Sequence, residues 1–156
     1  MAASYQLDRA KVIKSGLLAG VAGGGAEILW IMAVAALTNL SAVNVSRRIG
    51  ASFGIETISS TPGVLIGVTI HMALAVALGI AVAIGCHALA SRWLRGAGVY
   101  LVVSAALIGV WAFNFLLLLP LINPAFVDLV PYPISFISKL IFGLAAAEIL
   151  RRGNKA

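Results

Sequence analysis

Four polar residues lie inside long apolar stretches of the sequence: Glu27, His71, Asn114 and Lys139. Ionisable groups at membrane depth are costly, and they usually face a partner or a water-filled cavity. One interpretation is a buried Glu27–Lys139 ion pair that fixes which helices pack together, with the other two side chains completing its hydrogen bonds. The other is functional: a proton or ion relay, or a polar pocket for a substrate or a quinone-like headgroup.

A metal site would need more ligands than these residues supply. His71 and Glu27 give two, with Met32 or Met72 as soft additions, whereas zinc sites take three or four ligands in tight geometry. Haem could use only His71 and His87, which lie about 24 Å apart along one helix. The sequence therefore predicts no metal and no cofactor.

The familiar catalytic motifs are absent. The chain has no Walker loop, GxSxG, HExxH or CxxC sequence. Glu27 and Glu148 are predicted at opposite sides of the membrane, so they cannot act as paired carboxylates. The single cysteine, Cys86, lies in an apolar run and allows no internal disulfide. We therefore expect a protein that is not an enzyme.

The composition indicates which elements must position these residues. Hydrophobic residues make up 62% of the chain and charged residues only 10%, with a mean hydropathy of +1.07. These values exclude a soluble globular enzyme, a disordered tail and a disulfide scaffold. The net charge is +6, but the basic residues lie between apolar runs, which is typical of topology determinants rather than of a nucleic-acid surface. The expected partner is the lipid bilayer.

Four apolar runs are long enough to cross a membrane, because about 20 helical residues span a hydrocarbon core of about 30 Å. Pro120 is expected to stop or kink the third run. The sequence thus predicts an all-α fold, a polytopic four-helix transmembrane bundle that forms a single integral-membrane domain over residues 1–156. The predicted spans are 15–37, 63–89, 97–121 and 134–150.

The distribution of Lys and Arg predicts the orientation. The two termini and the second connection carry 8 of the 11 basic residues, namely Arg9, Lys11, Lys14, Arg92, Arg95, Arg151, Arg152 and Lys155. The first connection carries only Arg47 and Arg48, and the third carries none. Because cytoplasmic segments are enriched in Lys and Arg, we expect both termini in the cytoplasm and a location in the bacterial inner membrane.

Both outer connections contain apolar residues. Val45, Ile49 and Phe53 recur at helical spacing within residues 41–58, which predicts a short amphipathic helix on the membrane surface. The third connection is mostly apolar, and Pro124 can open a helical turn there. We expect this segment to pack over the outer end of the bundle.

Small residues indicate the contact faces of the helices. Gly20 and Gly24 share a face with Glu27, and His71 and Lys139 likewise lie beside small residues. By helix rise, Glu27 is about 18 Å from the cytoplasmic boundary, in the outer half of the membrane. The polar residues of the four helices are therefore expected to converge there. Trp111, one turn before Asn114, is a candidate for lining the same pocket.

The stretch from Trp111 to Ala147, together with Glu27 and Trp30 of the first run, resembles a family of small four-helix bacterial inner-membrane proteins without an established activity. The resemblance implies location and helix number but assigns no functional residue. The leading expectation is a non-catalytic accessory or structural membrane subunit, homo-oligomeric or part of a larger complex. The alternative is a small proton- or ion-coupled transporter or permeation unit.

Overall fold

The computed structural model describes residues 2–55, 60–89 and 97–153, and these are almost wholly helical, with no strand among them. Arg92, Arg95 and Lys155, which contributed to the predicted orientation, lie outside the described residues. Four helical segments are long and apolar enough to cross a membrane. They are α1 (Ala2–Leu37), α3 (Ser60–Leu89), α4 with its continuation (Gly98–Ile122) and α7 (Tyr132–Gly153).

The observed helices are longer than the apolar runs. α1 begins at Ala2 rather than near residue 15, because residues before the apolar run also adopt the helix. α3 begins at Ser60 and α7 at Tyr132, so that Pro62 and Pro133 both lie in a first turn, where a missing N–H costs no hydrogen bond. The apolar run marks the part of each helix that lipid can cover. The helix itself extends as far as its backbone hydrogen bonds continue, which is beyond the apolar run.

The third span does not stop at Pro120. α4 (Gly98–Ala112) widens into a π-helix, η2 (Phe113–Leu118), and continues as α5 (Leu119–Ile122). A proline ring clashes with the carbonyl four residues earlier in a regular α-helix. The wider turn directly before Pro120, in which the N–H of Leu119 bonds to the carbonyl of Asn114, accommodates the proline within a continuous span.

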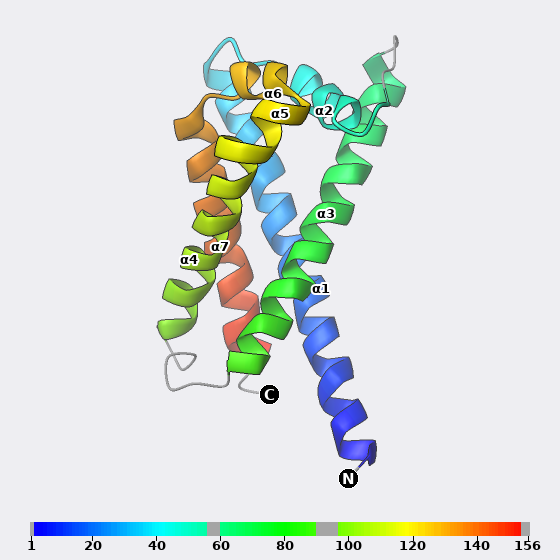
Figure 1. The fold of residues 1–156 in the computed structure, drawn as a ribbon, viewed down its shortest axis with the longest axis vertical. Helices are drawn as coiled ribbons and strands as arrows, with labels where there is room; N and C mark the ends of the chain where they lie inside the picture. The colour runs from blue at the N-terminus through cyan, green and yellow to red at the C-terminus, as the bar shows by residue number, and fades with distance from the viewer. Residues whose placement is uncertain (1, 56–59, 90–96, 154–156) are drawn as a thin grey trace.

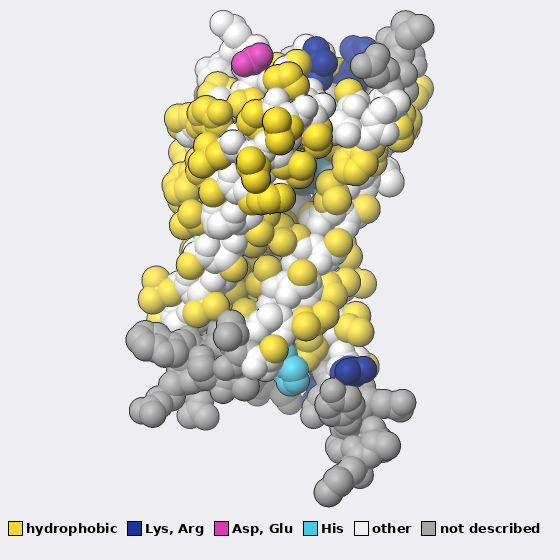
Figure 2. Space-filling view, in the orientation of Figure 1, with side chains coloured by type: hydrophobic (Ala, Val, Ile, Leu, Met, Phe, Trp, Pro, Cys, Tyr) yellow, Lys and Arg dark blue, Asp and Glu magenta, His cyan; other side chains and the backbone are white. Residues whose placement is uncertain are grey.

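The spanning helices pack in the order α3, α1, α7 and α4. α1 contacts both α3 and α7, and α4 packs on the other side of α7, whereas α3 and α4 touch little. The start of α1 and the end of α7 lie at one end of the bundle, and α2 (Ala42–Ala51), α5 and α6 (Pro124–Leu129) lie at the other (Figure 1). On the face shown in Figure 2, hydrophobic side chains cover the surface between the two ends, and Lys and Arg side chains appear at the ends.

Glycines allow the central helix to approach its neighbours closely. A Cβ on Gly20 would lie 2.5 Å from the carbonyl oxygen of Ala75 in α3, and Gly16 is equally crowded by Ile80. Gly23, in the same stretch of α1, lies against the ring of Phe142 in α7, which is fully buried. Close backbone approach is a main source of helix association in lipid, so Gly16, Gly20 and Gly23 are used within the bundle.

α2 covers one end of the bundle and is attached at two points. The hydroxyl of Ser46 donates to the carbonyl of Val64 in α3 at 2.9 Å, directly beside Gly67. The amide of Asn123, which precedes α6, donates to the carbonyl of Arg48 at 3.0 Å and to the hydroxyl of Ser52 at 2.8 Å.

The predicted amphipathic helix is therefore present over Ala42–Ala51, but it ends before Phe53, which is 55% exposed. The chain turns at Gly54 with a φ of 73°, a conformation that suits glycine. α6 begins at Pro124, as the sequence analysis expected for this turn.

Candidate functional site

Glu27 lies at the meeting point of three helices. Its side chain is on α1, one turn after Gly23, where the glycines bring α3 and α7 close. Only 3% of the residue is exposed. Its Oε1 accepts hydrogen bonds from Lys139 Nζ at 2.8 Å and from Ser138 Oγ at 2.9 Å, both on α7. One carboxylate oxygen is thus paired with a cation and a hydroxyl.

The other carboxylate oxygen faces α3. His71 Nε2 lies 3.8 Å from Glu27 Oε2 and 3.2 Å from the carbonyl oxygen of Gly24. The shorter contact favours the tautomer in which Nε2–H donates to that carbonyl. Glu27 Oε2 is buried and has no hydrogen-bond partner among the described residues. A buried polar atom without a partner is rare and costly, and the group nearest to this oxygen from α3 is the imidazole of His71.

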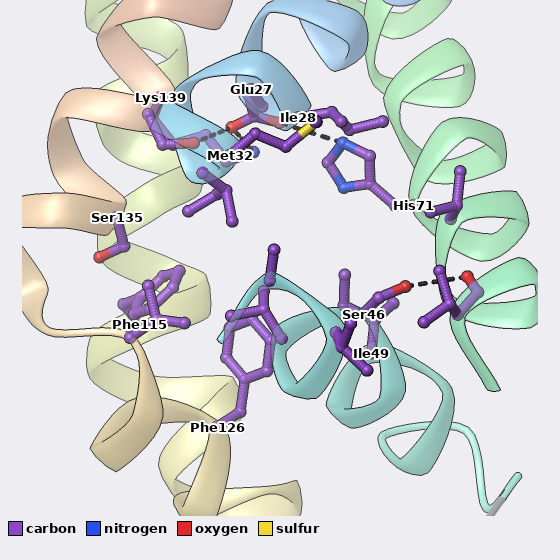
Figure 3. Close-up of a pocket in the computed structure, with 18 residues that line it drawn as sticks. Glu27, Ile28, Met32, Ser46, Ile49, His71, Phe115, Phe126, Ser135 and Lys139 are labelled. Carbon is purple, nitrogen blue, oxygen red and sulfur yellow. Dashed lines mark hydrogen bonds and ion pairs between the residues drawn. The ribbon is translucent and has the colours of Figure 1, made fainter. Parts of the chain in front are cut away.

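Glu27 lines one end of a chamber with a volume of about 320 Å³. The polar end of the chamber consists of Glu27, His71, Ser138 and Lys139, contributed by α1, α3 and α7 (Figure 3). The opposite, apolar end lies under α2 and α6. It is lined by side chains that include Val43, Val45, Ile49, Val64, Phe115 and Phe126.

The surface is hollowed between the upper part of α3 and the η2–α5 segment (Figure 2). His71 and Lys139 are 21% and 17% exposed at their side chains, compared with 4% for Glu27. The histidine and the lysine are therefore more accessible than the glutamate, and the chamber volume falls at the lower end of the range for ligand pockets, about 300–1,000 Å³.

The structure brings together three of the four expected polar residues. Glu27, His71 and Lys139 line the chamber, whereas Asn114 is not among its lining residues. The residue of this span that lines the chamber is Phe115. Helix-wheel reasoning at 100° per residue fails here because Asn114 lies in the π-helix, which has more residues per turn.

Trp111 lies behind the chamber wall rather than in it. Its Nε1 donates to the hydroxyl of Ser135 at 3.0 Å, and its ring contacts Phe136 edge-on, with the centroids 5.0 Å apart. Trp111 therefore supports Ser135, which lines the chamber, and does not itself line it. The candidate role assigned to Trp111 is replaced by a supporting one.

Two residues of the site were missed by sequence analysis. Ser138 shares the carboxylate oxygen of Glu27 with Lys139, and its position directly before Lys139 was the available signal. Asn123, 7% exposed, connects α6 to α2. No sequence pattern pointed to this link, because its acceptors are 71 and 75 residues away.

A second charged cluster lies near the opposite end of α7. Glu148 forms ion pairs with Arg151 at 2.7 Å and with Arg152 at 2.6 Å, and it also accepts a hydrogen bond from the hydroxyl of Tyr100 in α4. These pairs are at i, i+3 and i, i+4, the spacings that bring opposite charges together on one face of a helix. The cluster joins α4 to α7 and is far along α7 from Lys139. Within the described ranges, no group of three or more His, Cys, Asp or Glu residues could hold a metal ion.

These features define a class of protein: a helical bundle with four helices able to cross a membrane and a chamber between them that ends at buried charges. No protein-family model, curated protein or solved structure matches the chain. The resemblance noted from the sequence therefore stays a prediction, and the chamber is the feature from which a function can be inferred.

Proposed function

We propose that this protein is a non-catalytic, multi-pass permeation or carrier unit of the bacterial inner membrane, with both termini in the cytoplasm. Arg9, Lys11 and Lys14 lie near the start of α1, and Arg151 and Arg152 lie at the end of α7. Both segments are at the same end of the bundle (Figure 1). This clustering of positive charge supports a cytoplasmic position for that end, which leaves α2, α6 and the chamber toward the periplasm.

The observation that carries the proposal is that Glu27, whose Oε2 has no hydrogen-bond partner in the described part of the chain, lines the polar end of the chamber. A carboxylate that served only to align α1 with α7 would need no cavity beside it, and burial of an unsatisfied oxygen would be a pure cost. In the proposed role, Glu27 and His71 bind a proton or a polar solute in the chamber, and Lys139 supplies the counter-charge.

The glycine faces argue for the permeation unit over the accessory subunit. Small residues on the helix faces were one reason to expect a partner, but Gly16, Gly20, Gly23 and Gly24 of α1 are already packed against α3 and α7. The accessory or structural subunit stays as the second candidate because of Gly25, Gly85 and Gly109. A Cβ added to any of these three would meet no neighbouring atom of the described residues within 4 Å, which leaves room for another helix.

Proton flux into vesicles tests the proposal. We would reconstitute the purified protein into liposomes that contain a pH-sensitive dye and impose a pH gradient. The wild-type protein should accelerate acidification, and Glu27→Gln should abolish the acceleration because it removes the carboxylate proposed to bind the proton. Glu148→Gln is the matched control, since it removes a carboxylate at the other end of α7. Equal rates for wild type and Glu27→Gln would refute proton-coupled permeation.

Native mass spectrometry of the protein extracted gently from its own membranes separates the two candidates. A monomer or a symmetric oligomer supports the permeation unit. Co-purification of every copy with a larger enzyme would instead support the accessory subunit and would make that enzyme's chemistry the next question.

A further inference from the structure

The polarity of the chamber is inverted relative to the leaflet around it, and this restricts what it can hold. Its polar end, with Glu27 and Lys139, lies deep in the bundle, while its apolar end lies under α2 and α6 at the end of the bundle (Figure 3). A membrane phospholipid has the opposite arrangement, with its headgroup at the interface and its chains toward the midplane. The chamber therefore disfavours a lipid of the surrounding leaflet.

The charges at the polar end favour a neutral ligand. Glu27 and Lys139 are 2.8 Å apart and cancel each other, and His71 already contacts the carbonyl of Gly24. A ligand with a net charge would bring an uncompensated charge between apolar walls, which is strongly unfavourable.

The hydrogen-bonding positions that Glu27 and Lys139 leave unused indicate which polar group the ligand carries. Glu27 Oε2 is a buried acceptor without a donor among the described residues. The ammonium group of Lys139 has three N–H donors, of which Glu27 Oε1 takes one. The hydroxyl of Ser138 is already committed to Glu27. A hydroxyl group matches this pair of positions, because it can donate to Glu27 and accept from Lys139 at the same time.

The size and shape of the chamber define the apolar body. An engineered cavity of about 150 Å³ holds one benzene molecule, so 320 Å³ accommodates a ring with a short chain but not a diacyl lipid. The rings of Phe115 and Phe126, with centroids 6.0 Å apart, form part of the wall.

We propose that the chamber binds a small neutral amphiphile, an inference that rests on the proposed function. Its hydroxyl head donates to Glu27 Oε2 and accepts from Lys139. Its apolar body, about one ring and a short chain, lies under α2 and α6. The proposal names the class of solute that the permeation unit would take.

Four probes with the same apolar body test it: 4-butylphenol, butylbenzene, 4-butylbenzoate and 4-butylbenzylammonium. Binding to the purified protein in lipid nanodiscs would be measured by the quenching of tryptophan fluorescence and checked by calorimetry. We expect 4-butylphenol to bind about tenfold more tightly than butylbenzene, because a hydrogen bond to a charged acceptor is involved. Equal affinities of the two, or tighter binding of either charged probe, would overturn the proposal.

Two variants locate the effect at Glu27. In Glu27→Gln, the amide oxygen takes the hydrogen bonds of Ser138 and Lys139, so the amide N–H₂ replaces Oε2 and no acceptor is left for the phenol. The tenfold preference should vanish while butylbenzene still binds, which also shows that the chamber is intact. The double variant Glu27→Met/Lys139→Met leaves no unpaired charge and should give the same result if Glu27→Gln fails to fold. A preference that persists in the folded variants would place the phenol elsewhere.

The outcomes separate this inference from the proposed function. Proton flux that depends on Glu27 without any preference for the phenol would refute the ligand class and leave the permeation unit standing. A clear phenol preference without proton flux would support the ligand site and refute proton-coupled permeation. Mass spectrometry of the gently extracted protein adds a third arm: a bound phospholipid that 4-butylphenol displaces would overturn the argument from inverted polarity.

Discussion

The ammonium nitrogen of Lys139 lies 2.8 Å from Oε1 of Glu27, across 112 positions of the sequence. This contact joins α1 to α7, and the neighbouring Ser138 binds the same oxygen. The pair therefore satisfies one side of the carboxylate and leaves the other side to the chamber and to His71. One oxygen of this side chain joins two helices, and the other faces the imidazole of α3.

The pair should show its structural role in a double-variant series. Lys139→Met alone leaves Glu27 buried without a cation, and such a loss costs about 3–5 kcal/mol. Glu27→Met/Lys139→Met removes both charges and should recover most of that free energy of unfolding. The measurement is unfolding of the purified protein in mixed micelles. If the double variant were as unstable as Lys139→Met, the charges would not be coupled in the way that their distance indicates.

Ser138 should matter more than its small size suggests. Ser138→Ala removes a hydrogen bond to a charged acceptor, a contribution of about 1.5–3 kcal/mol, and should lower the unfolding temperature. Thr69→Ala is the matched control, because that hydroxyl bonds only to the carbonyl of Leu65 in its own helix and is exposed. Equal effects of the two substitutions would argue against the Ser138–Glu27 contact.

The packing of α1 on α3 should be sensitive to one added methyl group. In Gly20→Ala, the new Cβ would lie 2.5 Å from backbone atoms of Ala75 and Val76, so the helices must move apart at a cost of about 1–3 kcal/mol. Gly25→Ala adds the same group to the same helix where nothing lies within 4 Å, and it should cost nothing. Unfolding temperatures in detergent give the comparison, and parallel losses in both variants would contradict the packing.

Asn123 should hold the cover of the chamber in place. Asn123→Ala removes both hydrogen bonds from α6 to α2 and should increase amide hydrogen exchange over Ala42–Ala51, because α2 then keeps only its attachment to α3. Asn114→Ala provides the contrast: its side chain does not line the chamber, and exchange in α2 should stay unchanged. Unchanged exchange in Asn123→Ala would show that Ser46 and Val45 suffice to fix α2.

The orientation can be tested with a reporter fused after the last residue. A fluorescent protein that matures only in the cytoplasm should be bright there, and an alkaline phosphatase that is active only in the periplasm should be inactive. The opposite pair of results would invert the bundle and place the chamber toward the cytoplasm, against the distribution of Lys and Arg.

The sequence by itself determined the four membrane-length helices and the pairing of two charged residues of the polar site, Glu27 and Lys139. Long apolar runs dictate membrane-length helices because each buried backbone group must be satisfied within its own helix. The glycines at four-residue spacing predicted which face of α1 is approached closely, and the opposite charges of Glu27 and Lys139 predicted a partnership that the geometry now displays at 2.8 Å.

The tertiary structure alone decided which residues line and cover the chamber beside the Glu27–Lys139 pair. The π-helix before Pro120 changes the register of the third span, so that Phe115 lines the chamber in place of Asn114. The cover formed by α2 and α6 depends on Asn123, whose acceptors lie 71 and 75 residues away in the sequence. Helical periodicity describes one helix at a time, whereas a cavity and an unpartnered oxygen arise only from the distances between helices, which no single helix encodes.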